Sequence, residues 1–132
     1  MEKQLRALSV RQPYAEMIFT GEKDIEYRGR QTHIRGQVYV YACKAREPAE
    51  AYEDAGVDAD RLNHGMIVGT VEIVDCKENE DGEFEWHLAN PRRLRKPLAV
   101  RGVPQPGFFW PFGRPVEKRR GKATRGNGQG TK

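Results

Sequence analysis

Five charged side chains gather in the short stretch that follows Gly21, namely Glu22, Lys23, Asp24, Glu26 and Arg28. Apolar and charged residues alternate through the stretch, and this period of two predicts a half-buried strand whose polar face carries the charges. Glu26 and Arg28 are two residues apart, so their side chains point the same way on a strand. A carboxylate can accept from an exocyclic amine such as that of cytosine, while a guanidinium orients it or binds a carbonyl or phosphate. The charged face of this predicted strand is therefore a candidate site for a nucleobase or a phosphate.

The same residue types allow two other interpretations. A lysine beside a carboxylate can act as a general base on a 2′-hydroxyl or a water molecule, so Lys23 and Glu26 are also catalytic candidates. A charged strand face is, in general, most often a solvated surface whose ion pairs serve only the fold. The sequence leaves binding, catalysis and structural ion pairing open.

Further ligand-binding candidates lie outside the charged strand. Arg11, Gln12 and Tyr14 come from a turn between a predicted strand and a predicted helix. Gln12 either reads a base edge or caps that helix. Trp86 and Trp110 offer rings on which a base stacks with a gain of about 1–3 kcal/mol, although packing in the core is the commoner fate of a residue such as Trp86.

The composition describes one domain of 132 residues with 37% hydrophobic and 32% charged residues. No apolar run reaches the length of a membrane span, and the polar first residues lack the apolar segment of a signal peptide. We therefore expect a cytoplasmic protein without a membrane partner. Cys43 and Cys76 end apolar strand patterns and are expected to be buried thiols.

Metal and cofactor chemistry has little support in the sequence. The three histidines, His33, His64 and His87, are far apart and lack the spacing of metal ligands. No phosphate-cradling glycine loop of the P-loop type is present either. We expect neither a metal nor a cofactor.

The net charge of +4 is unevenly distributed. Residues 1–112 hold 16 basic and 18 acidic residues, whereas residues 113–132 hold 7 basic residues and 1 acidic residue. We therefore divide the chain into a folded domain, 1–112, and a basic, glycine-rich tail, 113–132, that is too polar to order itself. Such a tail either binds phosphates without sequence preference or only solubilises the protein. The candidate phosphate contacts are Arg92, Arg93, Arg119 and Arg120.

Short β-type patterns dominate the folded domain. The predicted strands are 5–10, the charged stretch after Gly21, 37–43, 65–76 and 84–88, and the predicted helices are 14–20 and 48–55. Gly21 should end the first helix in a left-handed conformation, and Gly69 should mark a bulge or a tight corner. Five to six short strands with two flanking helices predict a mostly β (α+β) fold, a small β-barrel.

Several of these motifs, in this order, resemble an ASCH domain over residues 5–112. The matching segments are Leu8-Ser9-Val10-Arg11-Gln12-Pro13-Tyr14, the G-x-K-x-x-E-x-R pattern of Gly21, Lys23, Glu26 and Arg28, the strands that begin at Gly36 and Gly65, and Trp86-His87-Leu88. The resemblance implies a PUA-like barrel that binds RNA or a modified nucleoside in a cleft beside the first helix. It also implies a range of activities, because members include coactivator modules, ribonucleases and a small branch of amidohydrolases acting on acylated cytidines.

One position departs from the amidohydrolase branch. The resemblance implies that the lysine of that branch corresponds to Lys23. The branch carries a threonine where this chain has Glu26, so the hydroxyl nucleophile is missing from this chain. We therefore expect a monomeric binding module for RNA or a modified nucleoside. The alternative is a ribonuclease or a nucleoside-directed hydrolase that uses Lys23 and Glu26, and a protein-interaction module is a third possibility.

Overall fold

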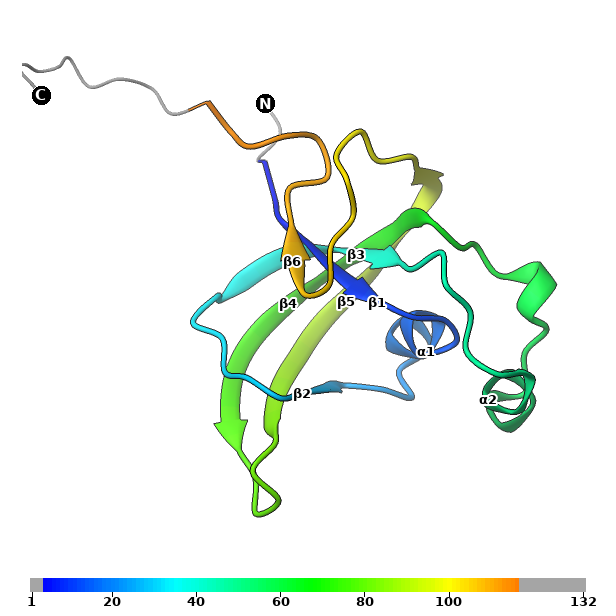
Figure 1. The fold of residues 1–132 in the computed structure, drawn as a ribbon, viewed down its shortest axis with the longest axis horizontal. Helices are drawn as coiled ribbons and strands as arrows, with labels where there is room; N and C mark the ends of the chain where they lie inside the picture. The colour runs from blue at the N-terminus through cyan, green and yellow to red at the C-terminus, as the bar shows by residue number, and fades with distance from the viewer. Residues whose placement is uncertain (1–3, 117–132) are drawn as a thin grey trace, which may run out of the picture.

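A computed structural model describes residues 4–116 (Figure 1). The described elements are β1 (Ala7–Val10), α1 (Tyr14–Thr20), β2 (Ile25–Arg28), β3 (Gly36–Ala42), α2 (Ala49–Ala55), the 3-10 turn η1 (Ala59–Arg61), β4 (Met66–Glu78), β5 (Phe84–Leu98) and β6 (Phe108–Phe109). The predicted fold class, mostly strands with two flanking helices, is confirmed. In this part of the chain, no helix is long and apolar enough to cross a membrane.

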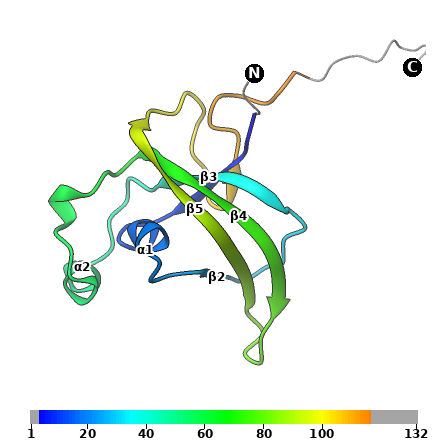
Figure 2. The same ribbon diagram turned by 180° about the vertical axis from the view of Figure 1, so that it is seen from behind.

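All the described strands belong to one sheet in the order β2-β5-β4-β3-β1-β6. β1 pairs with β3 in parallel, and the other neighbours are antiparallel. The long strands β4 and β5 run side by side and curve across the molecule, so the sheet curls into a half-barrel (Figures 1 and 2). β2 and β6 are the two edges of this sheet, and we call the region between them the seam.

The main core fills the inside of the curl, where α1 packs against the sheet. Ala15 and Ile18 of α1 are buried with apolar residues of β1, β3, β4 and β5. The helix ends as predicted, because Gly21 adopts a left-handed conformation with φ of 87° and donates its N–H to the Ile18 carbonyl. The N–H of Lys23 then bonds the Met17 carbonyl at 3.0 Å. This tight turn connects the end of α1 directly to the charged strand β2.

Gly69 allows α1 to lie close to the sheet. The pairing of β4 with β3 and β5 shifts register around this residue, which confirms the predicted break. A Cβ atom at Gly69 would lie 2.4 Å from the Phe19 ring and 2.5 Å from the Arg92 carbonyl oxygen. The φ angle of Gly69 is not left-handed, so its backbone conformation does not require glycine. Glycine is required instead by the close packing of the Phe19 ring and the neighbouring strand.

β5 is much longer than the strand predicted at 84–88. It continues through Pro91 and Pro97 to Leu98, paired with β4 throughout with local shifts in register. β2 covers only the first part of β5, as far as His87. The remaining part is an open edge, where a proline without an N–H group removes no ladder bond.

Candidate functional site

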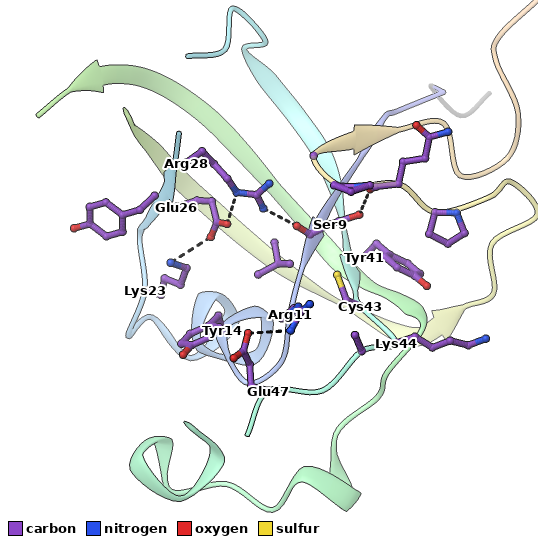
Figure 3. A pocket seen from close by; sticks show the side chains of 17 residues that line it. Ser9, Arg11, Tyr14, Lys23, Glu26, Arg28, Tyr41, Cys43, Lys44 and Glu47 are labelled. Atoms are coloured by element: carbon purple, nitrogen blue, oxygen red, sulfur yellow. Dashed lines mark hydrogen bonds and ion pairs between the residues drawn. The ribbon is translucent and has the colours of Figure 1, made fainter. Parts of the chain in front are cut away.

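A cleft of about 720 Å³ opens where β1, β2 and the end of β3 meet. We refer to it as the cleft. Its walls come from β1, the start of α1, β2, the segment after β3 and the loop before β6 (Figure 3). The lining residues are Ser9, Val10, Arg11, Tyr14, Lys23, Glu26, Tyr27, Arg28, Tyr41, Cys43, Lys44, Ala45, Glu47, Pro104, Gln105, Pro106 and Gly107. Arg11, Tyr14, Lys23, Glu26 and Arg28, all candidates from the sequence, are therefore brought together.

Glu26 is held between two cations inside the cleft. Its Oε1 lies 3.2 Å from Lys23 Nζ, and its Oε2 accepts a hydrogen bond of 2.7 Å from Arg28 Nε (Figure 3). Only 8% of Glu26 is exposed. Burial of a carboxylate is costly unless it is paired, and here each oxygen faces a cation. The two ion pairs therefore fix the orientation of the carboxylate.

The direction in which β2 faces argues against a solvated charged surface, one of the interpretations that the sequence leaves open. Glu26 is buried, whereas Tyr27 is 50% exposed and Ile25 is only half-buried. The alternation correctly groups Glu26 with Arg28, but the charged side of β2 points into the cleft. Ion pairing with Lys23 and Arg28 makes this inward orientation tolerable.

Arg28 joins the two sides of the seam. Its Nη2 donates a hydrogen bond of 2.6 Å to the Ser9 carbonyl on β1, so one guanidinium contacts both β2 and β1. The hydroxyl of Ser9 in turn donates to the Gln105 carbonyl at 2.7 Å, and the Ser9 N–H donates to the Gly107 carbonyl. Side-chain bonds thus hold the cleft walls together where the sheet itself does not close.

The cleft retains capacity for polar contacts with a ligand. A carboxylate offers about four lone-pair directions, and the contacts of Glu26 occupy only two. Lys23 Nζ, which also donates to the Ile25 carbonyl at 2.7 Å, lies 6.0 Å from the Tyr14 ring centre and 5.7 Å from that of Tyr27. Both rings are substantially exposed, so a flat ligand can reach them beside the ion pairs.

Two titratable side chains that line the cleft, Cys43 and Tyr41, have raised pKa values. Burial raises the pKa of the Cys43 thiol, and this outweighs the lowering effect of Arg11 and Arg28. Burial likewise raises the pKa of the Tyr41 phenol. A protonated thiol is a poor nucleophile, so the position of Cys43 in the cleft favours contact rather than covalent chemistry.

Sequence reasoning missed several lining residues. Tyr27, Tyr41 and Glu47 carry no sequence signal for a ligand contact, and Cys43 is expected only as a buried thiol. Glu47 reaches the rim from the segment before α2 and lies 3.5 Å from Arg11. The parallel pairing of β1 with β3 places the ends of both strands at one edge of the cleft. A sequence pattern that reveals the strands does not reveal this pairing.

Three predicted ligand contacts lie elsewhere, which corrects their assignment to the cleft. Gln12 is 2% exposed and caps α1, because its Oε1 accepts from the N–H of Glu16 and its Nε2 donates to the Asn63 carbonyl. Trp86 is also 2% exposed, and its ring stacks on Phe108 with centroids 5.3 Å apart. The ring of Trp110 lies beneath the guanidinium of Arg6, away from the cleft lining.

The predicted phosphate contacts are dispersed. Arg92 is exposed on β5, whereas Arg93 forms a bidentate ion pair with Glu16 of α1. Arg119 and Arg120 lie outside the described residues, as does most of the predicted tail. Neither Arg92 nor Arg93 lines the cleft, so no described member of this set contributes to it.

Comparisons with known proteins identify the family of the chain and its relatives. The family model described as the ASCH domain matches residues 8–98. Activating signal cointegrator 1 from Homo sapiens is 26% identical over 122 residues, which cover 74% of this chain and 21% of that protein; the Mus musculus protein is 25% identical with the same coverage. The chain thus spans about a fifth of the length of these relatives.

Solved structures extend the likeness to the fold. The crystal structure of ASCH from Zymomonas mobilis has a TM-score of 0.54 and 12% identity, covering 83% of this chain and 88% of that chain. A point mutant of the same Zymomonas mobilis protein gives the same TM-score and identity with coverages of 82% and 90%. The family model matches well over half of the chain, and the half-barrel is the fold of the ASCH structures, so the chain belongs to the ASCH domain family.

Proposed function

We propose that this ASCH domain binds RNA, or a modified nucleoside, by holding an amine-bearing base such as cytosine in the cleft. The observation that carries the proposal is the orientation of Glu26. Its carboxylate is buried, fixed by Lys23 and Arg28, and still able to accept hydrogen bonds. A pre-oriented acceptor of this kind suits the exocyclic amine of cytosine, whereas the O4 carbonyl of uracil offers it no proton.

The surrounding groups complement the rest of a nucleotide. Tyr14 and Tyr27 are exposed at the mouth of the cleft, and either ring can stack on a base. The lining also has four basic side chains, Arg11, Lys23, Arg28 and Lys44, against two acidic ones, Glu26 and Glu47. This excess of positive charge favours a ligand that carries phosphate.

A base-preference titration tests the proposal. A fluorescein-labelled nonamer of uridines is compared with the same nonamer carrying one central cytidine, by fluorescence anisotropy on the full chain. We expect the cytidine strand to bind about 5- to 150-fold more tightly, the range given by one good hydrogen-bonded base contact. Equal affinities for the two strands would contradict selection of an amine-bearing base by Glu26.

Hydrolysis is a second candidate function because Lys23 Nζ lies 3.2 Å from Glu26 in the cleft. The one aliphatic hydroxyl among the lining residues, that of Ser9, already donates to the Gln105 carbonyl. Prolonged incubation of the cytidine strand, followed by mass analysis of the products, separates the candidates. A binding module leaves the strand intact, whereas a catalytic pair yields products that disappear in Glu26→Gln although the strand still binds.

A further inference from the structure

A second depression lies directly beside the cleft, between the two edges of the sheet. Its volume is about 1030 Å³ and it extends from β2 and the β2–β3 loop across to the start of β6. We call it the basic groove. Its lining contains four arginines and one histidine, namely Arg6, Arg28, Arg30, Arg35 and His33. None of its described lining residues is aspartate or glutamate.

Three of the four arginines that line the basic groove are exposed and lack a carboxylate partner among the described residues. Arg6, Arg30 and Arg35 are all exposed, and within residues 4–116 none of them pairs with a carboxylate. Arg6 lies over the Trp110 ring with its guanidinium 4.6 Å from the ring centre, so the ring orients it while leaving its charge available. Like charges held together without counter-charges favour an anionic ligand.

The loop that carries these arginines is held in place by its own bonds. Trp86 Nε1 donates to the Arg30 carbonyl at 3.0 Å, and the buried Thr32 accepts from the N–H of Ile34 at 3.1 Å. Arg35 Nη1 donates to the carbonyls of Thr32 and Ile34, both at 2.9 Å. A loop fixed in this way presents its cations with little ordering cost when a ligand binds.

The basic groove and the cleft share one wall. Arg28, Pro106 and Gly107 line both, and Arg28 is the residue that bonds Glu26 in the cleft and Ser9 across the seam. The shared wall gives a polymer whose base lies in the cleft a direct path past Arg28 into the basic groove. The neighbouring phosphates then meet Arg30 and Arg6, which line the same groove.

We propose that the basic groove binds the phosphodiester backbone next to the nucleotide in the cleft, so that the ligand is a single-stranded RNA rather than a free nucleoside. This inference rests on the proposed function, from which it takes the base in the cleft. It assigns the backbone contacts to the β2–β3 loop, in place of Arg92 and Arg93 on β5. The guanidinium of Arg30 is the clearest contact, since it is exposed and no side chain of the described residues holds it.

The test measures the salt dependence of binding in charge variants of Arg30. The uridine nonamer with one central cytidine is titrated with the wild type, Arg30→Gln and Arg30→Glu at several salt concentrations. Arg61 of η1 is exposed and lines neither the cleft nor the basic groove, so Arg61→Gln and Arg61→Glu are matched controls. Thermal melting of each variant checks that the fold is kept.

We expect Arg30→Gln to weaken binding about threefold and to lower the slope of log affinity against log salt by about 0.7, the value for one lost contact to a single strand. Arg30→Glu should weaken binding about tenfold or more, because repulsion replaces attraction. The Arg61 variants should leave the slope unchanged. Equal slopes for the wild type and both Arg30 variants would overturn the assignment.

The outcome separates this inference from the proposed function. If the Arg30 variants change nothing but the cytidine strand is still preferred over the uridine strand, the inference fails and the proposed function stands. If the Arg30 variants lower the slope and cytidine brings no preference, the proposed function fails and only the backbone site stands. Equal competition by inorganic polyphosphate at matched phosphate concentration would also overturn the inference, since it would show a general anion site.

Discussion

Replacement of Glu26 by glutamine should abolish the preference of the cleft for cytidine over uridine. The amide has nearly the same shape, but its NH₂ group must face Lys23 or Arg28, which are both donors. It also leaves the two cations without their counter-charge, so the affinity for the uridine strand should rise slightly while the gain from cytidine disappears. The expected loss of discrimination is about 1–3 kcal/mol. Anisotropy titrations with the two nonamers measure it.

A carboxylate outside the cleft provides the control. Asp60 bonds Arg46 at 3.0 Å, as Glu26 bonds Arg28, but it lies on η1 and lines no part of the cleft. Asp60→Asn should therefore keep the preference for the cytidine strand. A preference that survives in Glu26→Gln at the wild-type level would show that Glu26 does not read the base.

Introduction of a single methyl group at Gly69 should destabilise the whole domain. In Gly69→Ala the new Cβ would meet the Phe19 ring at 2.4 Å and the Arg92 carbonyl at 2.5 Å. The ring can turn away only by disturbing the packing of α1, and the carbonyl belongs to the neighbouring strand β5. Overpacking of this kind costs about 3 kcal/mol. The melting temperature should fall by on the order of 10 °C.

Gly29 offers a matched substitution in open space. A Cβ atom there would meet nothing within 4 Å, and its backbone is not left-handed. Gly29→Ala should leave the melting temperature of the domain nearly unchanged. A similar loss in both variants, or no loss in Gly69→Ala, would show that the close packing at Gly69 does not control stability.

The elements that depend on local signals were predictable from the sequence. The helix from Tyr14 to Thr20, its end at Gly21 and the break at Gly69 all follow from backbone chemistry that a few neighbouring residues determine. The clustering of Glu26 with Arg28 is equally local, because residues two apart on a strand share a face. Lys23 joins them because the exit from α1 is tight.

The features that depend on distant partners were not predictable. Alternation shows which residues share a face of β2, but it does not show which face turns inward. Glu26 faces inward because Lys23 and Arg28 pair with its carboxylate there. The sequence leaves Gln12 open between a base contact and a helix cap, and the bond from its Nε2 to the Asn63 carbonyl comes from a distant segment. The continuation of β5 beyond Pro91 depends on where β2 stops pairing, which no local pattern records.

The most direct test of the account maps the bound strand onto the domain. Amide ¹⁵N chemical shifts are followed while the nonamer with one cytidine is added to the labelled full chain. We expect the largest changes at residues 23–28, at Ser9 and near Cys43, with a second set in the β2–β3 loop at 29–35. Changes confined to the exposed part of β5, residues 92–96, with none on β2, would contradict it.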